Sequence, residues 1–133
     1  MTISRLSVCL SVCIGFFVLG PADANAQMPQ PAVHLATLPN PISHGDEYTI
    51  AGTVTDIADG QVIRVEIDNF YPNPNGNPPM LTKSASESCS VSGGAFTMTD
   101  SFTFLGSGSF FVYGTLVSDP FISDAESGDV SAP

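Results

Sequence analysis

Hydrophobic and polar residues alternate in short runs along the chain, and Gly, Pro, Asn and Asp separate the runs. In the clearest run, residues 61–70, the side chains of Ile63, Val65 and Ile67 alternate with charged ones. A second clear run covers residues 109–117. A period of two is typical of β-strands, because successive side chains point to opposite faces. Both runs are predicted strands, and no segment after the first 26 residues shows the period of an amphipathic helix.

Weaker alternation predicts further strands between the turn-forming stretches. These segments are residues 33–38, 48–55, 86–91 and 95–105. The acidic tail, residues 120–133, is weakly patterned, so either a short strand near 129–131 or a frayed end is expected. Six or seven short strands at near-regular spacing predict an all-β sandwich or barrel.

Residues 71–79 (YPNPNGNPP) interrupt the pattern with four prolines. Proline cannot donate a hydrogen bond to a sheet, so a paired strand is not expected here. The Asn and Gly residues favour turns. We predict a surface loop of partly polyproline character, and we do not expect a hairpin turn at Asn75-Gly76 between the prolines.

The first 26 residues have the anatomy of a secretory signal peptide. Arg5 precedes a mostly apolar stretch from Leu6 to Leu19, and Ala24 and Ala26 are the small residues of a cleavage site. The apolar stretch is shorter than the ~20 residues of a membrane-spanning helix. A cleavable signal peptide is therefore predicted, with secretion or a location in the periplasm or cell envelope. The alternative is an uncleaved N-terminal anchor.

The charge balance excludes several partner classes. The 133 residues contain 3 Lys+Arg and 13 Asp+Glu, which gives a formal net charge of −10. So few cations cannot neutralise a row of phosphates, so we expect no nucleic-acid partner. The same shortage argues against docking on anionic lipid, and no membrane insertion is expected after signal cleavage. With 43% hydrophobic residues, the chain is too apolar for a disordered acidic tail.

Four segments resemble strands of bacterial immunoglobulin-like (Ig-like) domains of secreted proteins. They are residues 45–54 (GDEYTIAGTV), 62–67 (VIRVEI), 94–98 (GAFTM) and 108–119 (GSFFVYGTLVSD). The resemblance covers most of residues 42–119. It implies an Ig-like antiparallel β-sandwich of about seven short strands. The expected order is a signal peptide at 1–26, a Pro-rich extended lead-in at 27–41, the sandwich at 42–119 and the tail at 120–133.

Groups that could perform chemistry are few. Cys89 is the single cysteine after the signal peptide, so it is either a buried strand residue or one half of a Cys89-linked dimer. His34 and His44 have no nucleophile motif beside them, so no enzyme activity and no catalytic residue is predicted. The spacing of these histidines and Met28 does not support a copper or zinc site.

The expected topology gathers acidic residues at one end of the sandwich, which we call the acidic pole. In an Ig-type strand order, the connection at 56–60 and the connection after residue 117 lie at the same end. Calcium takes about six to eight oxygen ligands, which loops of this kind supply. The alternative is that these acids form turns and add solubility, with no cofactor bound. The candidate calcium ligands are Asp56, Asp59, Asp119, Asp124 and Glu126.

The opposite end, which we call the loop pole, would carry the turns at 41–45 and 105–108 and the loop at 71–79. Rigid aromatic and Pro-rich loops lose little entropy on binding, so this end could present a shallow ligand face. An ordinary long connection is the alternative. The candidate ligand residues are Phe70, Tyr71, Asn73, Asn75 and Asn77.

The sequence thus predicts an exported, non-catalytic Ig-like module that binds a protein or glycan through its end loops. The alternative is a structural or assembly accessory that joins a surface complex by an edge strand. A calcium-binding sandwich and a small envelope enzyme are more distant alternatives.

Overall fold

The computed structural model describes residues 30–133, so the expected signal peptide lies outside the described residues. Every regular element from Gln30 onward is a strand, and this part of the chain contains no helix that could cross a membrane. The all-β class is therefore confirmed. The strands are β1 (Ala32–Leu35), β2 (Glu47–Tyr48), β3 (Ala51–Thr55), β4 (Val62–Pro72), β5 (Met80–Ser90), β6 (Ala95–Thr97), β7 (Phe102–Thr103), β8 (Gly108–Leu116) and β9 (Ser123–Val130).

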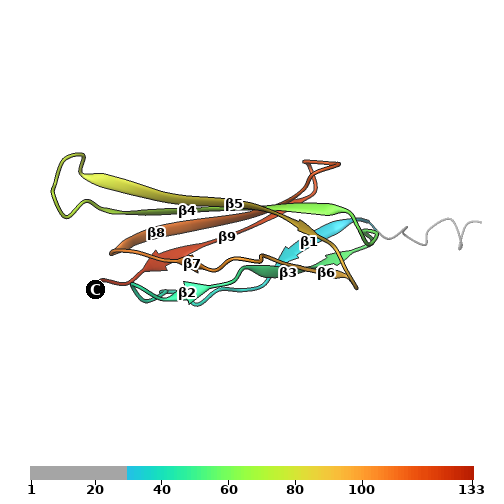
Figure 1. The fold of residues 1–133 in the computed structure, drawn as a ribbon, viewed down its shortest axis with the longest axis horizontal. Coiled ribbons are helices and arrows are strands. Elements are labelled where there is room, and N and C mark those ends of the chain that lie inside the picture. Colours follow the sequence, from blue (N-terminus) through green and yellow to red (C-terminus); the bar gives the residue numbers. More distant parts are fainter. Residues whose placement is uncertain (1–29) are drawn as a thin grey trace, which may run out of the picture.

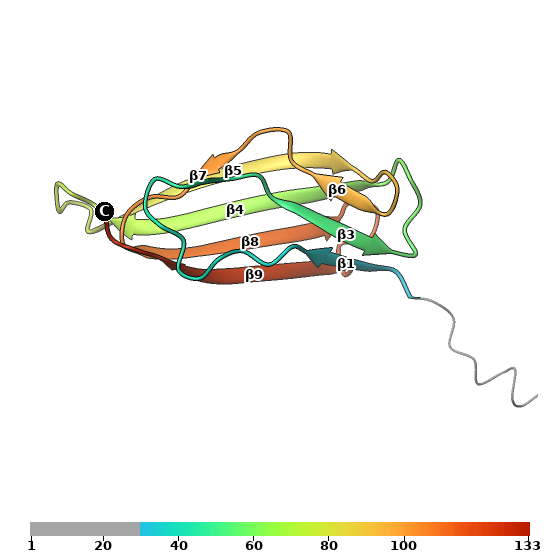
Figure 2. The same cartoon turned by 90° about the horizontal axis from the view of Figure 1, so that it is seen from below.

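The strands form two layers of antiparallel sheet (Figures 1 and 2). One layer is a four-stranded sheet in the order β5-β4-β8-β9. The other layer contains a three-stranded sheet, β1-β3-β6, and a short pair, β2-β7. In Figure 1 the four-stranded sheet lies above the layer that holds β2, β3, β6 and β7.

The hydrophobic core lies between these layers and follows the predicted alternation. In β4, Ile63, Val65 and Ile67 have no exposed surface, whereas Arg64 and Glu66 are exposed. A buried strand face of this kind stabilises the fold by removing apolar area from water. The side chains predicted to share a register in 95–105 are also buried: Phe96, Met98, Phe102 and Phe104.

Phe104 is the centre of an aromatic cluster in this core. Its ring meets Phe102 at 4.9 Å, Phe110 at 5.2 Å and Tyr48 at 6.1 Å between centroids, each edge to face. Edge-to-face pairs contribute about 0.5–1.5 kcal/mol beyond the buried area. The cluster therefore joins β2 and β7 to β8 in the opposite sheet.

The serine-rich segment differs from its prediction. We expected one or two short strands around 86–91, but β5 runs without a break from Met80 to Ser90 and pairs with β4 along its whole length. The expectation failed because the inward positions of β5 include the charged residues Lys83 and Glu87, so its alternation carries little hydrophobic signal.

The prediction that residues 71–79 form no paired strand is wrong at the start of this segment, because Tyr71 and Pro72 belong to β4. Pro72 pairs with Met80, the Asn73 N–H donates to the Pro79 carbonyl at 2.9 Å, and the Gly76 N–H donates to the Asn73 carbonyl. A hairpin therefore forms in spite of the prolines. Pro72 is tolerated because even-numbered residues of β4 bond towards β8, and that ladder has already ended at Phe70.

The acidic tail forms a full strand. β9 spans Ser123–Val130 and pairs with β8, beyond the short strand near 129–131 that the sequence suggested. Its inward positions before the buried Val130 are Asp124, Glu126 and Gly128, so no apolar alternation marks it. Pairing with the strongly apolar β8 decides its conformation instead.

Candidate functional site

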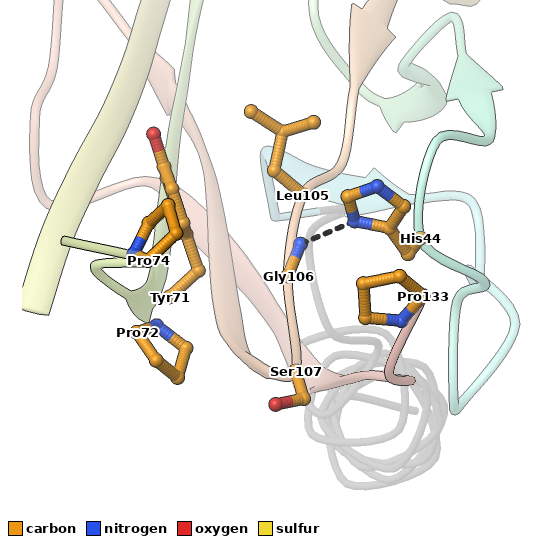
Figure 3. A pocket seen from close by; sticks show the side chains of 8 residues that line it. All are labelled: His44, Tyr71, Pro72, Pro74, Leu105, Gly106, Ser107 and Pro133. Carbon is orange, nitrogen blue, oxygen red and sulfur yellow. Dashed lines mark hydrogen bonds between the residues drawn. The ribbon is translucent and has the colours of Figure 1, made fainter.

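Three connections meet at the loop pole and enclose a pocket of about 280 Å³. They are the turn at 41–45, the hairpin loop after β4 and the turn at 105–108, as the topology predicted. Figure 3 shows the proline rings of the hairpin loop on one side and His44 with Pro133 on the other. The lining residues are His44, Tyr71, Pro72, Pro74, Leu105, Gly106, Ser107 and Pro133.

A glycine is required at the floor of this pocket. Gly106 has a φ of +75°, which side-chain-bearing residues rarely adopt. A Cβ there would overlap the Cβ of Tyr71. The bare backbone therefore allows Tyr71 to lie directly against the turn, so that aromatic, proline and leucine side chains form a largely apolar wall.

His44 fixes one side of the pocket to its floor. Its Nδ1 accepts a hydrogen bond from the Gly106 N–H at 2.6 Å. Because an acceptor nitrogen carries no proton, the neutral ring has its proton on Nε2. The Gly45 N–H also donates to the Phe104 carbonyl at 2.8 Å, so the turn is attached to the adjoining segment. The imidazole is thus held in place with a donor on its other nitrogen.

A buried asparagine supports the same turn from the core. Asn69 is fully buried, and its Oδ1 accepts from the Leu105 N–H at 2.7 Å. Its Nδ2 donates to the carbonyls of Leu105 and Ser109 at 3.3 and 3.2 Å. Sequence reasoning missed this residue, although it is a polar residue in the inward register of β4. All its polar atoms are satisfied, so it rigidifies the wall behind the pocket.

The five predicted ligand residues do not share one surface. Tyr71 lines the pocket, whereas Phe70 lies on the outer face of the sheet, with its ring 6.0 Å from that of Phe111. Neighbours in a strand point to opposite faces, which separates them. Asn73 Oδ1 accepts from the Asn75 N–H and so shapes the turn, while Asn75 and Asn77 are exposed in the hairpin loop outside the pocket lining. His44, Leu105 and the three lining prolines were not predicted as individual ligand residues.

The acidic pole brings its two connections together, as the topology predicted. Ser118 Oγ donates to Gln61 Oε1 at 3.1 Å, and both residues line a second, shallow pocket with Asp56. Asp59 accepts from the Gly93 N–H, and Asp119 accepts from the Phe121 N–H.

Three of the candidate calcium ligands, Asp59, Asp119 and Asp124, therefore accept from separate backbone groups. Asp124 accepts from the Leu35 N–H, and Glu126 lies on β9 opposite Val112. Within residues 30–133, no three His, Cys, Asp or Glu side chains are grouped to hold a metal ion. Calcium binding stays a prediction, and a melting temperature that is equal in millimolar calcium and in EDTA would contradict it.

Cys89 lies in the core with 4% of its surface exposed. Burial, and then the negative charge of Glu87, raise the pKa of the thiol. A raised pKa lowers the fraction of reactive thiolate. These features support the interpretation of Cys89 as a packing residue, and a dimer linked through it stays a prediction. His34, the other histidine considered for catalysis or metal binding, is exposed on β1.

Comparison with known proteins gives no family assignment. No protein-family model matches the chain, and no curated protein matches it significantly.

Proposed function

We propose that this chain is an exported, non-catalytic Ig-like module that binds a protein or glycan through the pocket at the loop pole. Export rests on the predicted signal peptide at residues 1–26. Export would be supported if protein recovered outside the cytoplasm has the intact mass of a chain that begins at Gln27. The full-length mass in a membrane fraction would contradict it.

The strand order supports the Ig-like assignment. With a sheet of the order β5-β4-β8-β9 facing one of the order β1-β3-β6, the chain crosses between the layers after β3, β5 and β7, as in Greek-key sandwiches. The short strands β2 and β7 are neighbours of β3 and β6 in the sequence, because β2 precedes β3 and β7 follows β6. An experimental structure with a different strand order would contradict the assignment.

The observation that carries the binding function is the convergence of three connections on one largely apolar pocket. Binding sites are commonly apolar clefts with a few oriented polar groups. Here the walls are Tyr71, Leu105 and prolines, and His44 and Ser107 contribute polar groups. Proline and a hydrogen-bonded imidazole restrict the walls, so little ordering is required when a ligand enters.

A blocking substitution tests this function. The probes are a glycan array and a displayed peptide library, screened against the chain and against Ser107→Trp, which would fill the pocket. Asn75→Trp is the matched control, because it adds the same side chain to an exposed loop position outside the lining. Binding lost only in Ser107→Trp supports the proposal. Binding that both variants retain, or no binding by the unmodified chain, contradicts it.

A second candidate function is assembly through an edge strand. The observation that favours it is β5, which pairs with β4 on one side and, within residues 30–133, with no strand on the other. Open strand edges are used to add a strand from a partner. Envelope subunits that co-purify with the chain would favour this function over soluble-ligand binding.

A further inference from the structure

The open edge of β5 is long and regular. β5 has 11 residues and forms one border of the four-stranded sheet, as Figure 2 shows. The Val91 N–H donates to the Gln61 carbonyl, and the Asn73 N–H donates to the Pro79 carbonyl, so odd-numbered residues bond towards β4. The N–H and C=O groups of the even-numbered residues therefore point outward from the sheet.

The side chains on this border leave room for another strand. The outward-bonding residues from Thr82 to Ser90 are all Ser or Thr, and all are exposed. No proline occurs between Met80 and Ser90. The border therefore offers a template for strand addition over its whole length.

Two charged residues on the inner face of β5 decide which strand can be added. Lys83 Nζ donates to the Thr103 carbonyl at 2.8 Å and lies 4.6 Å from the centre of the Phe102 ring. Glu87 accepts from the Thr99 N–H at 2.6 Å and from the Asp100 N–H at 3.3 Å. Inward-pointing charges on an edge strand oppose most added strands, because the new strand would bury them without a counter-charge.

We infer that two copies of this chain pair through antiparallel β5 strands, in the register centred on Ala85. In that register Lys83 of each copy lies opposite Glu87 of the other, and Ser84 exchanges hydrogen bonds with Ser86. A shift by two residues would place Lys83 opposite Ala85 or Cys89, so the charges select one register. The product is an eight-stranded sheet with a two-fold axis at Ala85.

Both charged groups have the capacity for the new contact. Lysine has three N–H donors, of which Thr103 uses one, and a carboxylate has about four acceptor positions, of which Glu87 uses two. Lys83 and Glu87 of the other copy would form a non-hydrogen-bonded pair. The Cα atoms of such a pair are about 4.5 Å apart, which is within reach of a Lys–Glu ion pair. This inference is independent of the pocket, which lies at the loop pole.

The first experiment compares proline substitutions on the two borders of the sheet. Residues 27–133, which include all described strands, are studied by sedimentation equilibrium. We expect a dimer for the unmodified chain and about thirtyfold weaker dimerisation for Ser86→Pro, because two hydrogen bonds per dimer are lost. Ser127→Pro is the matched control, since Ser127 is exposed and bonds outward from β9. A monomer up to about 1 mM, or equal weakening by both variants, overturns the inference.

The second experiment tests the register. Lys83→Glu and Glu87→Lys should each weaken self-association, since each places like charges opposite one another. An equimolar mixture of the two variants should form a heterodimer, because Glu and Lys again face one another at both positions. Circular dichroism confirms that each variant folds. Dimers of either single variant that are as tight as the original, or a mixture that stays monomeric, overturn the proposed register.

Discussion

The two border strands of the four-stranded sheet differ in what lies beside them. At β9, the segment after β1 crosses over and bonds to the border: the Ile42 N–H donates to the Asp129 carbonyl and the Ser131 N–H donates to the Ile42 carbonyl. Asn40 Oδ1 accepts from the Asp129 N–H at 3.0 Å. At β5, by contrast, the backbone edge has no such cover within the described chain, and only the inner-face side chains of Lys83 and Glu87 are tied to the other layer.

One sheet therefore has a border at β9 that is closed at its end and a border at β5 that is selective. A border whose end is bonded to the chain's own backbone, as at Asp129 of β9 and at Ser131 just after it, cannot pair with an added strand at that end without local unfolding. The border of β5 carries the opposite charges of Lys83 and Glu87. It therefore excludes most strands but can add one with the complementary charges, and we call it the guarded border. The substitutions below probe the closed border first, where the effect on stability is largest, and the guarded border last.

Removing the anchor of the closed border should have the largest effect. Ile42 has no exposed surface and bridges to Val130. Ile42→Ala should lower the free energy of unfolding by about 2–4 kcal/mol, because it removes buried methyl groups and leaves a cavity. Urea denaturation measures this loss. Val117→Ala is the control, since Val117 is 48% exposed, and it should change stability by less than about 0.5 kcal/mol. Equal losses for both would contradict the anchoring role.

Adding a methyl group beneath the closed border should have a smaller effect. A Cβ on Gly128 would lie 2.8 Å from Cε1 of Phe110 and 3.0 Å from Cγ of Asn40. Gly128→Ala should therefore cost about 1–3 kcal/mol by overpacking. Thermal unfolding is the measurement, and Ser127→Ala on the exposed face is the control. A stability equal to that of the control would show that Asn40 and the crossing segment move aside freely.

Removing one side-chain acceptor should weaken the closed border locally. Asp124 Oδ2 accepts from the Leu35 N–H at 2.8 Å. Asp124→Ala leaves that partly buried N–H without its partner, so we expect a loss of about 1–2 kcal/mol and faster hydrogen exchange at Leu35. Asp129→Ala should leave the exchange rate unchanged, because the described border contacts of Asp129 use its backbone. Slow exchange in Asp124→Ala would refute this role.

The smallest expected effect lies at the guarded border and depends on pH. The hydrogen bond from the Thr99 N–H, aided by that from Asp100, holds the pKa of Glu87 below its ordinary value near 4.5. A lowered pKa in the folded state stabilises the fold above the ordinary value, and this contribution is lost as the pH falls through the lower folded pKa. Glu87→Gln should therefore be slightly destabilised at pH 7.

The difference in unfolding free energy between Glu87→Gln and the original chain should shrink as the pH falls from about 5 to about 3. Urea denaturation across this range measures it. Glu66→Gln, on the exposed outer face of β4, is the matched control and should show a smaller change with pH. A difference that stays constant with pH would mean that the charge of Glu87 contributes nothing at this border.

Much of the fold could be predicted from the sequence where buried positions are apolar. The alternation in 61–70 and 109–117 gave the positions of β4 and β8 and, for β4, the inward direction of the apolar side chains, because burial selects apolar residues at every second position. The same reasoning failed for β5 and β9. Their inward positions include Lys83, Glu87, Asp124 and Glu126, so hydrophobic periodicity could not reveal them.

The candidate site was predictable as a place but not as a set of residues. Strand order predicts that the connections at 41–45, 71–79 and 105–108 share one end, and they do line one pocket. The structure places Phe70 and Tyr71 on opposite faces of the sheet, because the strand continues further than the prolines suggested. His44 enters the site through one hydrogen bond across 62 sequence positions, which no local pattern indicates.

The pattern of residues along the chain therefore predicted the all-β class, the two central strands, the buried face of β4 and the grouping of the loops. Tertiary contacts made a polar tail into β9, bonded residues 40–42 to the end of this strand, and left the edge of β5 without a partner strand in residues 30–133. The physical reason is that alternation records the local balance of burial and exposure. Border pairing, in contrast, depends on backbone hydrogen bonds between distant segments, which polar and apolar side chains permit equally well.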